Sequence, residues 1–334
     1  MKRLAFRGQP LECEPQFRDA RGRAIWLNAQ IAERFPMTAL ISISHVTRYR
    51  YDCPVSFGTH RLLVRPRDGH DLRVLETHLV ITPKPKLHWQ FDAFGNSVAH
   101  AVFSESSDSL EIRSDLLIRR YVSHSEISSP NRALRRMPLE YGADNLTDLA
   151  PYIPMQFPEE GEALSQWLNA AFQNRPSVIL EFLSALSATI HAAFSYSRRE
   201  ERGTQSALTT VAKKTGTCRD FAFLFMECAR LFGFAARFVT GYLHVRESED
   251  EMLKGGGSTH AWADVYVPGE GWVEFDPTNL IEGNQALIRI AVTRTPAQAT
   301  PISGTYDREQ GRFLGMTVDV SVREVFENED GTSI

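Results

Sequence analysis

The chain has 334 residues, of which 43% are hydrophobic and 23% charged, with a formal net charge of -4. This length and composition can bury a substantial core, and we expect two domains. A pI near 6.2 gives no electrostatic reason to expect nucleic acid or an anionic membrane surface as a partner. No apolar run has signal-peptide character or the length to span a bilayer, so we expect a cytoplasmic protein.

The cysteines form no recognisable ligand or disulfide pattern. Cys13, Cys53, Cys218 and Cys228 lie far apart and lack CxxC spacing. Neither a zinc site nor a disulfide framework is indicated, and the four are interpreted as reduced thiols. We expect no metal and no cofactor.

Residues 1–36 differ from the rest of the chain because they are rich in arginine and show no clear periodicity. Strand character begins abruptly at Ile41, just after Met37. We expect residues 1–36 to be a poorly structured leader or a mis-assigned start, with a regulatory tail as the alternative.

Residues 37–125 show many short apolar stretches that alternate with polar residues. Turn signals such as Asp52-Cys53-Pro54 and Phe94-Gly95-Asn96 separate them. This pattern predicts an N-terminal antiparallel β-sandwich domain. Residues 126–160 are rich in proline and weakly periodic, so they are expected to form a linker.

Residues 161–285 are expected to form a second domain, followed by an extension over 286–334 that ends in a strand over 313–325. Helical spacing of apolar residues predicts helices over 162–172 and 177–194, a short helix over 204–211, and a helix that starts near Cys218. Alternation predicts strands over 236–245, 259–267 and 272–276.

The start of the Cys218 helix is well specified. Thr217 is a good N-cap and Asp220 follows three residues later, close to the capping-box pattern. The unpaired N–H groups and the helix dipole at such a terminus favour a thiolate over a thiol, and the same N–H groups could hold an oxyanion. Taken alone, Cys218 would still more often be an ordinary buried thiol.

The two strands after this helix place further polar residues on one face. His260 and Trp262 share a face of the first strand because side chains alternate. If a five-residue loop pairs Tyr266 with Trp272, Asp276 falls opposite Trp262 and diagonal to His260 on that face. A slip of one residue would send Asp276 to the other face, so the register is a testable prediction.

These residues suggest a catalytic triad. Cys218 would attack a carbonyl carbon, and His260 would take the thiol proton and later protonate the leaving amine. Asp276 would orient the imidazole and stabilise its charged form.

Two segments carry a family resemblance: GTCRDFAFLFMECARLFGFAARFVTGYL and STHAWADVYVPGEGWVEFDPTN. They resemble the transglutaminase-like superfamily of papain-fold cysteine enzymes, whose triad positions fall on Cys218, His260 and Asp276. The region before them resembles the β-rich domain of bacterial members, so the resemblance runs from about residue 40 onward. It implies an α+β fold, with the catalytic cysteine at the N-terminus of a helix packed on an antiparallel sheet. Thr217 and Arg219 depart from the residues that usually flank this cysteine.

The resemblance implies acyl transfer on amide bonds through a thioester on Cys218. Water as acceptor would make the protein a peptidase or amidase, which we favour because bacterial relatives are mostly described as proposed cysteine proteases. An amine acceptor would make it a transglutaminase. A catalytically idle binding scaffold is the alternative from another class. The implied partners are a peptide or protein substrate and, through the family, ATP-grasp-type peptide-ligating proteins.

Three further residues could support the triad. Trp262 could wall the cleft or belong to the core. Asp220 is better explained as a helix cap, because an unpaired carboxylate beside Cys218 would oppose thiolate formation. Tyr196 resembles a tyrosine that lies upstream of the cysteine in relatives and would line the site.

Overall fold

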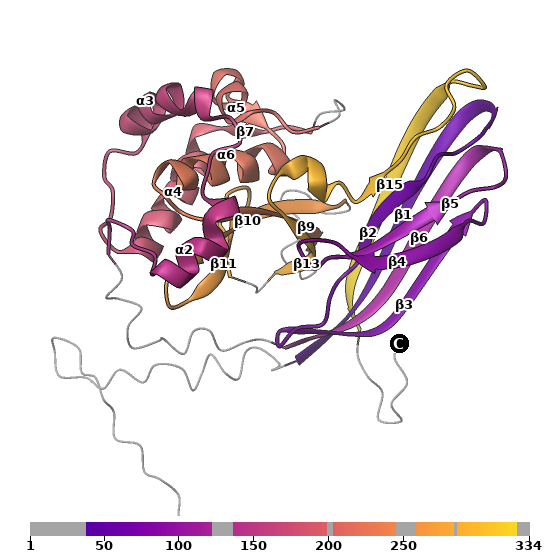
Figure 1. Cartoon of the computed structure of the whole chain (residues 1–334), viewed down its shortest axis with the longest axis horizontal. Helices are drawn as coiled ribbons and strands as arrows, with labels where there is room; N and C mark the ends of the chain where they lie inside the picture. The colour runs from indigo at the N-terminus through magenta and orange to yellow at the C-terminus, as the bar shows by residue number, and fades with distance from the viewer. Residues whose placement is uncertain (1–37, 122–135, 199–202, 245–257, 284–285, 326–334) are drawn as a thin grey trace, which may run out of the picture. The chain divides into compact units, whose positions relative to one another are not determined.

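The computed structural model describes residues 38–121, 136–198, 203–244, 258–283 and 286–325. The expected leader, residues 1–36, and residues 126–135 of the expected linker lie outside these ranges. The fold is α+β, with a β-rich N-terminal region followed by a core of helices and an antiparallel sheet, as predicted (Figure 1).

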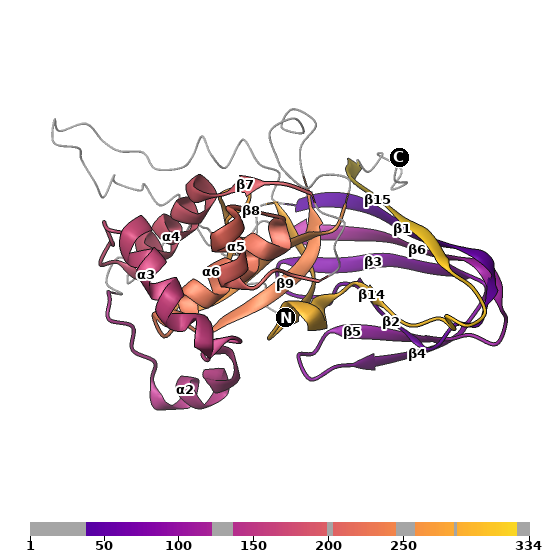
Figure 2. The ribbon, with the colours of Figure 1, turned by 90° about the horizontal axis from the view of Figure 1, so that it is seen from above.

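Two four-stranded antiparallel sheets form the N-terminal β-sandwich. The first has the order β15 (Phe313–Val325), β1 (Thr38–Val55), β6 (Ser107–Tyr121), β3 (Leu72–Thr82), and the second β14 (Ile302–Ser303), β2 (His60–Arg65), β5 (Ser97–Val102), β4 (Lys86–Phe91). Figure 2 shows them as two layers. Apolar side chains from both sheets, among them Val55, Leu62 and Ile112, share one buried cluster. The antiparallel β-sandwich is therefore confirmed.

The end of the chain returns to this sandwich. The strand expected over 313–325 is β15, which pairs antiparallel with β1 from Leu40 to Tyr51. Residues 287–293, in contrast, were expected to lie outside the second domain. They form β13 (Leu287–Thr293), which pairs with β9 in the sheet of that domain. The reason is that Leu287, Ile288 and Ala291 are all buried there.

The second domain is built on the five-stranded core sheet. Its order is β12 (Ile281–Glu282), β11 (Gly271–Asp276), β10 (His260–Val267), β9 (Ala236–Leu243), β13. The helices are α2 (Ala143–Leu149), α3 (Gly161–Ala171), α4 (Ile179–Ala193), α5 (Ala207–Lys213) and α6 (Cys218–Leu231), with 3-10 turns η2 (Ala150–Tyr152), η3 (Pro158–Glu160) and η4 (Pro296–Ala299). Two short strands, β7 (Ser195–Tyr196) and β8 (Thr215–Gly216), pair in parallel.

The predicted helices α3, α4, α5 and α6 are present within three residues at either end, whereas α2, η2 and η3 fall in the segment expected to be a linker. Figure 1 shows the larger helices grouped next to β9 and β10. Within the described ranges, no helix has the length and apolar run needed to cross a membrane.

Both faces of the core sheet are buried. On one face, Ala261 and Val265 of β10 pack in the cluster that contains Phe225 of α6. On the other, Trp262 of β10 packs with Val239 and Leu243 of β9 and with Leu287 of β13. Tyr242 of β9 and its pairing partner Ile288 of β13 pack with sandwich residues such as Ile43. Full burial of such a side chain stabilises a fold by about 1.5 to 3 kcal/mol. The core sheet thus gives a rigid platform for the polar residues at the start of β10 and the end of β11.

Candidate active site

The helix that carries Cys218 begins as predicted. Cys218 is the first residue of α6 and is 8% exposed. The Asp220 carboxylate accepts hydrogen bonds from the Thr217 backbone N–H at 2.9 Å and from the Gln205 backbone N–H at 2.8 Å. Asp220 therefore caps the helix and ties a preceding loop to it, which is the interpretation favoured from sequence.

A close backbone approach brings Tyr196 to the same terminus. Gly216 pairs with Tyr196 between β8 and β7. A Cβ at Gly216 would lie 2.9 Å from the Asp220 Cβ, so a glycine is needed for β8 to pass so near the first turn of α6. Burial, followed by the charge of a Cys218 thiolate, raises the pKa of Tyr196. The structure thus places Tyr196 beside Cys218.

The hairpin has the predicted register. Tyr266 pairs with Trp272 and Ala263 with Phe275, which puts Asp276 at the position diagonal to His260. His260 Nε2 donates a hydrogen bond to Asp276 Oδ2 at 2.7 Å, and both side chains are fully buried. The pairing of β10 with β11 therefore creates this contact.

Asp276 is held by more than His260. The Thr278 backbone N–H donates to Asp276 Oδ1 at 2.9 Å, and the Asn279 carboxamide donates to Oδ2 at 3.0 Å. Burial alone would raise the pKa of Asp276, but the charge of His260 and these hydrogen bonds outweigh it and lower the pKa. Sequence reasoning missed Thr278 and Asn279, although both directly follow Asp276-Pro277 in a turn.

His260 connects the carboxylate to the thiol. An ionised carboxylate only accepts hydrogen bonds, so Nε2 carries the proton and Nδ1 is the ring nitrogen left for Cys218. Burial would lower the pKa of His260, but the charges of Asp276 and Cys218, together with the hydrogen bond to Asp276, raise it to about 10. The imidazole is then charged at neutral pH. The structure brings together all three expected triad residues, from α6, β10 and β11.

Trp262 lies against the imidazole. Its ring stacks on that of His260, with centroids 6.2 Å apart and an interplanar angle of 29°. It is fully buried and packs with Val239, Leu243 and Leu287. Trp262 is thus a core side chain that also covers one face of His260 from water.

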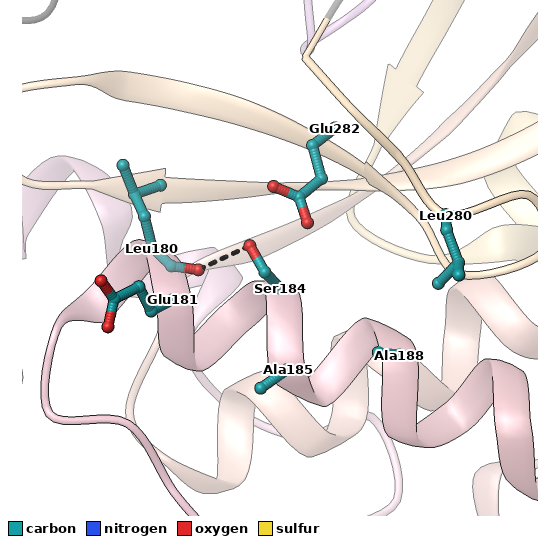
Figure 3. A pocket seen from close by; sticks show the side chains of 7 residues that line it. All are labelled: Leu180, Glu181, Ser184, Ala185, Ala188, Leu280 and Glu282. Atoms are coloured by element: carbon teal, nitrogen blue, oxygen red, sulfur yellow. Dashed lines mark hydrogen bonds between the residues drawn. The ribbon is translucent and has the colours of Figure 1, made fainter.

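A pocket of about 560 Å³ lies between α4 and residues 280–282 (Figure 3). It is lined by Leu180, Glu181, Ser184, Ala185, Ala188, Leu280 and Glu282. Figure 3 shows the Glu282 side chain over α4, where the Ser184 hydroxyl donates to the Leu180 carbonyl at 2.9 Å. None of the expected triad residues lines the pocket. Among the described residues, no group of His, Cys, Asp or Glu side chains could hold a metal ion.

Two family models match the chain. Residues 166–277 match the transglutaminase-like superfamily, and residues 41–119 match the bacterial transglutaminase-like N-terminal region. The chain therefore belongs to the transglutaminase-like superfamily, in its bacterial form with the β-rich N-terminal region.

Several relatives extend over nearly the whole protein. An uncharacterised protein of Mycobacterium tuberculosis is 28% identical over 296 residues, which cover 83% of this chain and 91% of the relative. An uncharacterised protein of Mycobacterium leprae is 21% identical over 280 residues, which cover 84% of this chain and 97% of the relative. A solved structure of a proposed cysteine protease from Cytophaga hutchinsonii superimposes with a TM-score of 0.65 at 18% identity, covering 85% of this chain and 91% of that one. At this identity the likeness shows a shared fold.

Proposed function

We propose that the protein is a cysteine-dependent hydrolase of amide bonds, a peptidase or amidase, with Cys218, His260 and Asp276 as its catalytic triad. The observation that carries this proposal is the buried 2.7 Å bond between His260 and Asp276, with Cys218 acting on the same imidazole. A thiol at a helix N-terminus next to a charged imidazole is the usual arrangement of a cysteine nucleophile.

In the first half of the reaction, the Cys218 sulfur attacks the carbonyl carbon of the substrate amide and a C–S bond forms. The N–H groups at the start of α6 would stabilise the resulting oxyanion. His260 gives its proton to the amide nitrogen, the C–N bond breaks, and the amine leaves. The acyl group remains on Cys218 as a thioester.

In the second half, water attacks the thioester while His260 takes a proton from it. The C–S bond breaks, the carboxylic acid leaves, and the Cys218 thiolate and the charged His260 are restored. Asp276 keeps Nδ1 of His260 directed at the reacting atoms throughout. Trp262 supports the triad by excluding water from one face of the His260 imidazole. Tyr196 supports it by bordering Cys218.

The test is incubation of the protein with a mixture of peptides, with and without an added primary amine, followed by mass spectrometry. We expect cleaved peptides from the wild type and a loss of about 10⁴-fold or more in Cys218→Ala. Cys228→Ala is the matched control, because Cys228 lies on the same helix and burial raises its pKa well above the usual range. Amine incorporation without cleavage would instead identify a transglutaminase.

Alkylation separates an enzyme from an idle scaffold. At pH 6 iodoacetamide should modify Cys218 faster than Cys53, whose pKa is raised by its hydrogen bond to Asp52. Equal rates would contradict the proposal.

The proposed function also includes a location and a partner. We propose that the protein is cytoplasmic, which the cysteine pattern supports. We also propose that it works with ATP-grasp-type peptide-ligating proteins.

A further inference from the structure

The turn after β11 is fixed from several sides. Asp276 pairs with Ile281 of β12, so residues 277–280 form a short connection between the two strands. Leu280 has a φ of 55°, a conformation that non-glycine residues rarely adopt. The His191 ring of α4 donates from Nδ1 to the Pro277 carbonyl at 3.2 Å. The turn is therefore held in one conformation by its neighbours.

This turn carries Asn279 to the catalytic carboxylate. The Asn279 carboxamide nitrogen reaches Asp276 Oδ2, the oxygen that also accepts from His260 Nε2. With the Thr278 N–H on Oδ1, the carboxylate has donors on both oxygens. Rotation of the Asp276 carboxylate would break the bond to Asn279 as well as the bond to His260.

We propose that Asn279 is a positioning residue, whose carboxamide fixes the Asp276 carboxylate so that Asp276 remains ionised and directs His260 toward Cys218. This inference rests on the proposed function and adds a fourth residue to it. Asn279 acts through Asp276, so it is expected to alter the protonation of the site rather than to touch substrate.

The titratable groups around the His260–Asp276 pair determine how the reactivity of Cys218 depends on pH. His260 faces Asp276 from β10, and Cys218 faces His260 from α6. Tyr196 borders Cys218 from β7, and His191 contacts the backbone at Pro277 from α4. Loss of a donor that stabilises the carboxylate makes this cluster bind a proton more readily.

The experiment measures the rate of Cys218 alkylation by iodoacetamide from pH 4 to 9, which needs no substrate. In Asn279→Ala the acid limb of the profile should move up by about one pH unit, the value of a hydrogen bond to a charged group. Asn279→Asp has nearly the same size and adds a negative charge. It should therefore move the limb further in the same direction.

Asn96→Ala is the matched control, since the carboxamide of buried Asn96 donates to Asp92 at the same 3.0 Å and to the Val292 carbonyl at 2.7 Å, without a hydrogen bond to any triad residue. Its profile should equal that of the wild type. An unshifted limb in both Asn279 variants, or an equal shift in Asn96→Ala, would overturn the inference while Cys218 remains reactive. A wild-type Cys218 that reacts no faster than Cys53 at pH 6 would overturn the proposed function and this inference together.

Discussion

Glu274 is a carboxyl group with an unusual surrounding. It pairs directly with Asp264 across β10 and β11, and both residues are buried. Arg237 bonds Asp264 at 2.8 Å, whereas Arg289 approaches Glu274 only to 4.0 Å. Burial and the charge of Asp264 raise the pKa of Glu274 to about 8. Glu274 therefore holds a proton at neutral pH in the folded protein.

This proton makes stability depend on pH. The unfolded chain releases it near pH 4.5 and the folded protein near pH 8, so the free energy of unfolding should fall as pH rises between these values. Glu274→Gln should reduce that fall by about 1.4 kcal/mol or more, the value of one pKa unit. Urea unfolding at pH 5 and pH 8 measures it. Glu162→Gln, at an exposed position, should behave as the wild type, and an unchanged slope in Glu274→Gln would refute the prediction.

Local patterns predicted some site residues and not others. Cys218 follows a helix cap, and the positions of His260 and Asp276 follow from strand alternation and a short loop, all readable within a few residues. Asn279 has no such signal, because its role depends on how the turn after β11 folds back. The raised pKa of Glu274 depends on burial and on pairing with Asp264, which a single strand pattern does not disclose.

The strand β9 has a glycine, Gly241, at the position where it pairs with both β10 and β13. Gly241 pairs with His260 on one side and with Arg289 on the other. A Cβ at this position would collide with the Ile288 carbonyl oxygen and lie 2.7 Å from Trp262 Cη2. The absence of a side chain at Gly241 thus allows Trp262 to stack on His260.

Gly241→Ala should accordingly destabilise the protein and disturb the site. Overpacking of a buried position costs about 1 to 3 kcal/mol, and here part of the obstacle is backbone, so we expect about 2 kcal/mol or more. Cys218 alkylation at pH 6 should also slow, because displaced Trp262 no longer supports His260. Thermal unfolding and alkylation measure the two effects. Gly315→Ala, where a Cβ would meet no atom within 4 Å, should leave both unchanged. Equal stability of the two variants would contradict the argument.

The elements differed in how far sequence predicted them. α6 and the β10–β11 hairpin were predicted with their register, since each has a cap or turn and a clear period. The seven-residue helix α2 is too short to show a clear helical period of apolar residues. β13 has buried residues on both faces and was assigned to an extension, because an apolar run does not disclose which sheet it joins.

The whole molecule is joined by contacts between residues far apart in sequence. β15 pairs with β1 across more than 250 residues, and Tyr242 of the core sheet lies against the sandwich. Its hydroxyl is 2.9 Å from His45 Nδ1, while His45 Nε2 is 3.0 Å from the Thr47 hydroxyl. The sandwich strands were predicted, but no local pattern predicted that His45 would contact the core sheet.

This contact should be sensitive to acid. Burial lowers the pKa of His45 to about 4, whereas an unfolded histidine titrates near 6.5. The unfolded chain then binds more protons between these values, so the free energy of unfolding should decrease as pH falls from 6.5 to 4. His45→Gln keeps a polar side chain without this titration. It should lose less stability over that interval, by about 1.4 kcal/mol or more.

Urea unfolding at pH 7 and pH 4.5 measures the difference, with His88→Gln as the control because His88 is exposed on β4. The control should follow the wild type, and a His45→Gln variant that does so as well would contradict a buried neutral His45. Since Glu274 lowers the free energy of unfolding as pH rises from 4.5 to 8, the two opposing slopes overlap between pH 4.5 and 6.5, and these two groups should place maximal stability there. The double variant His45→Gln, Glu274→Gln should then show a flatter pH profile than either single variant, because each single variant leaves the slope of the other group unopposed.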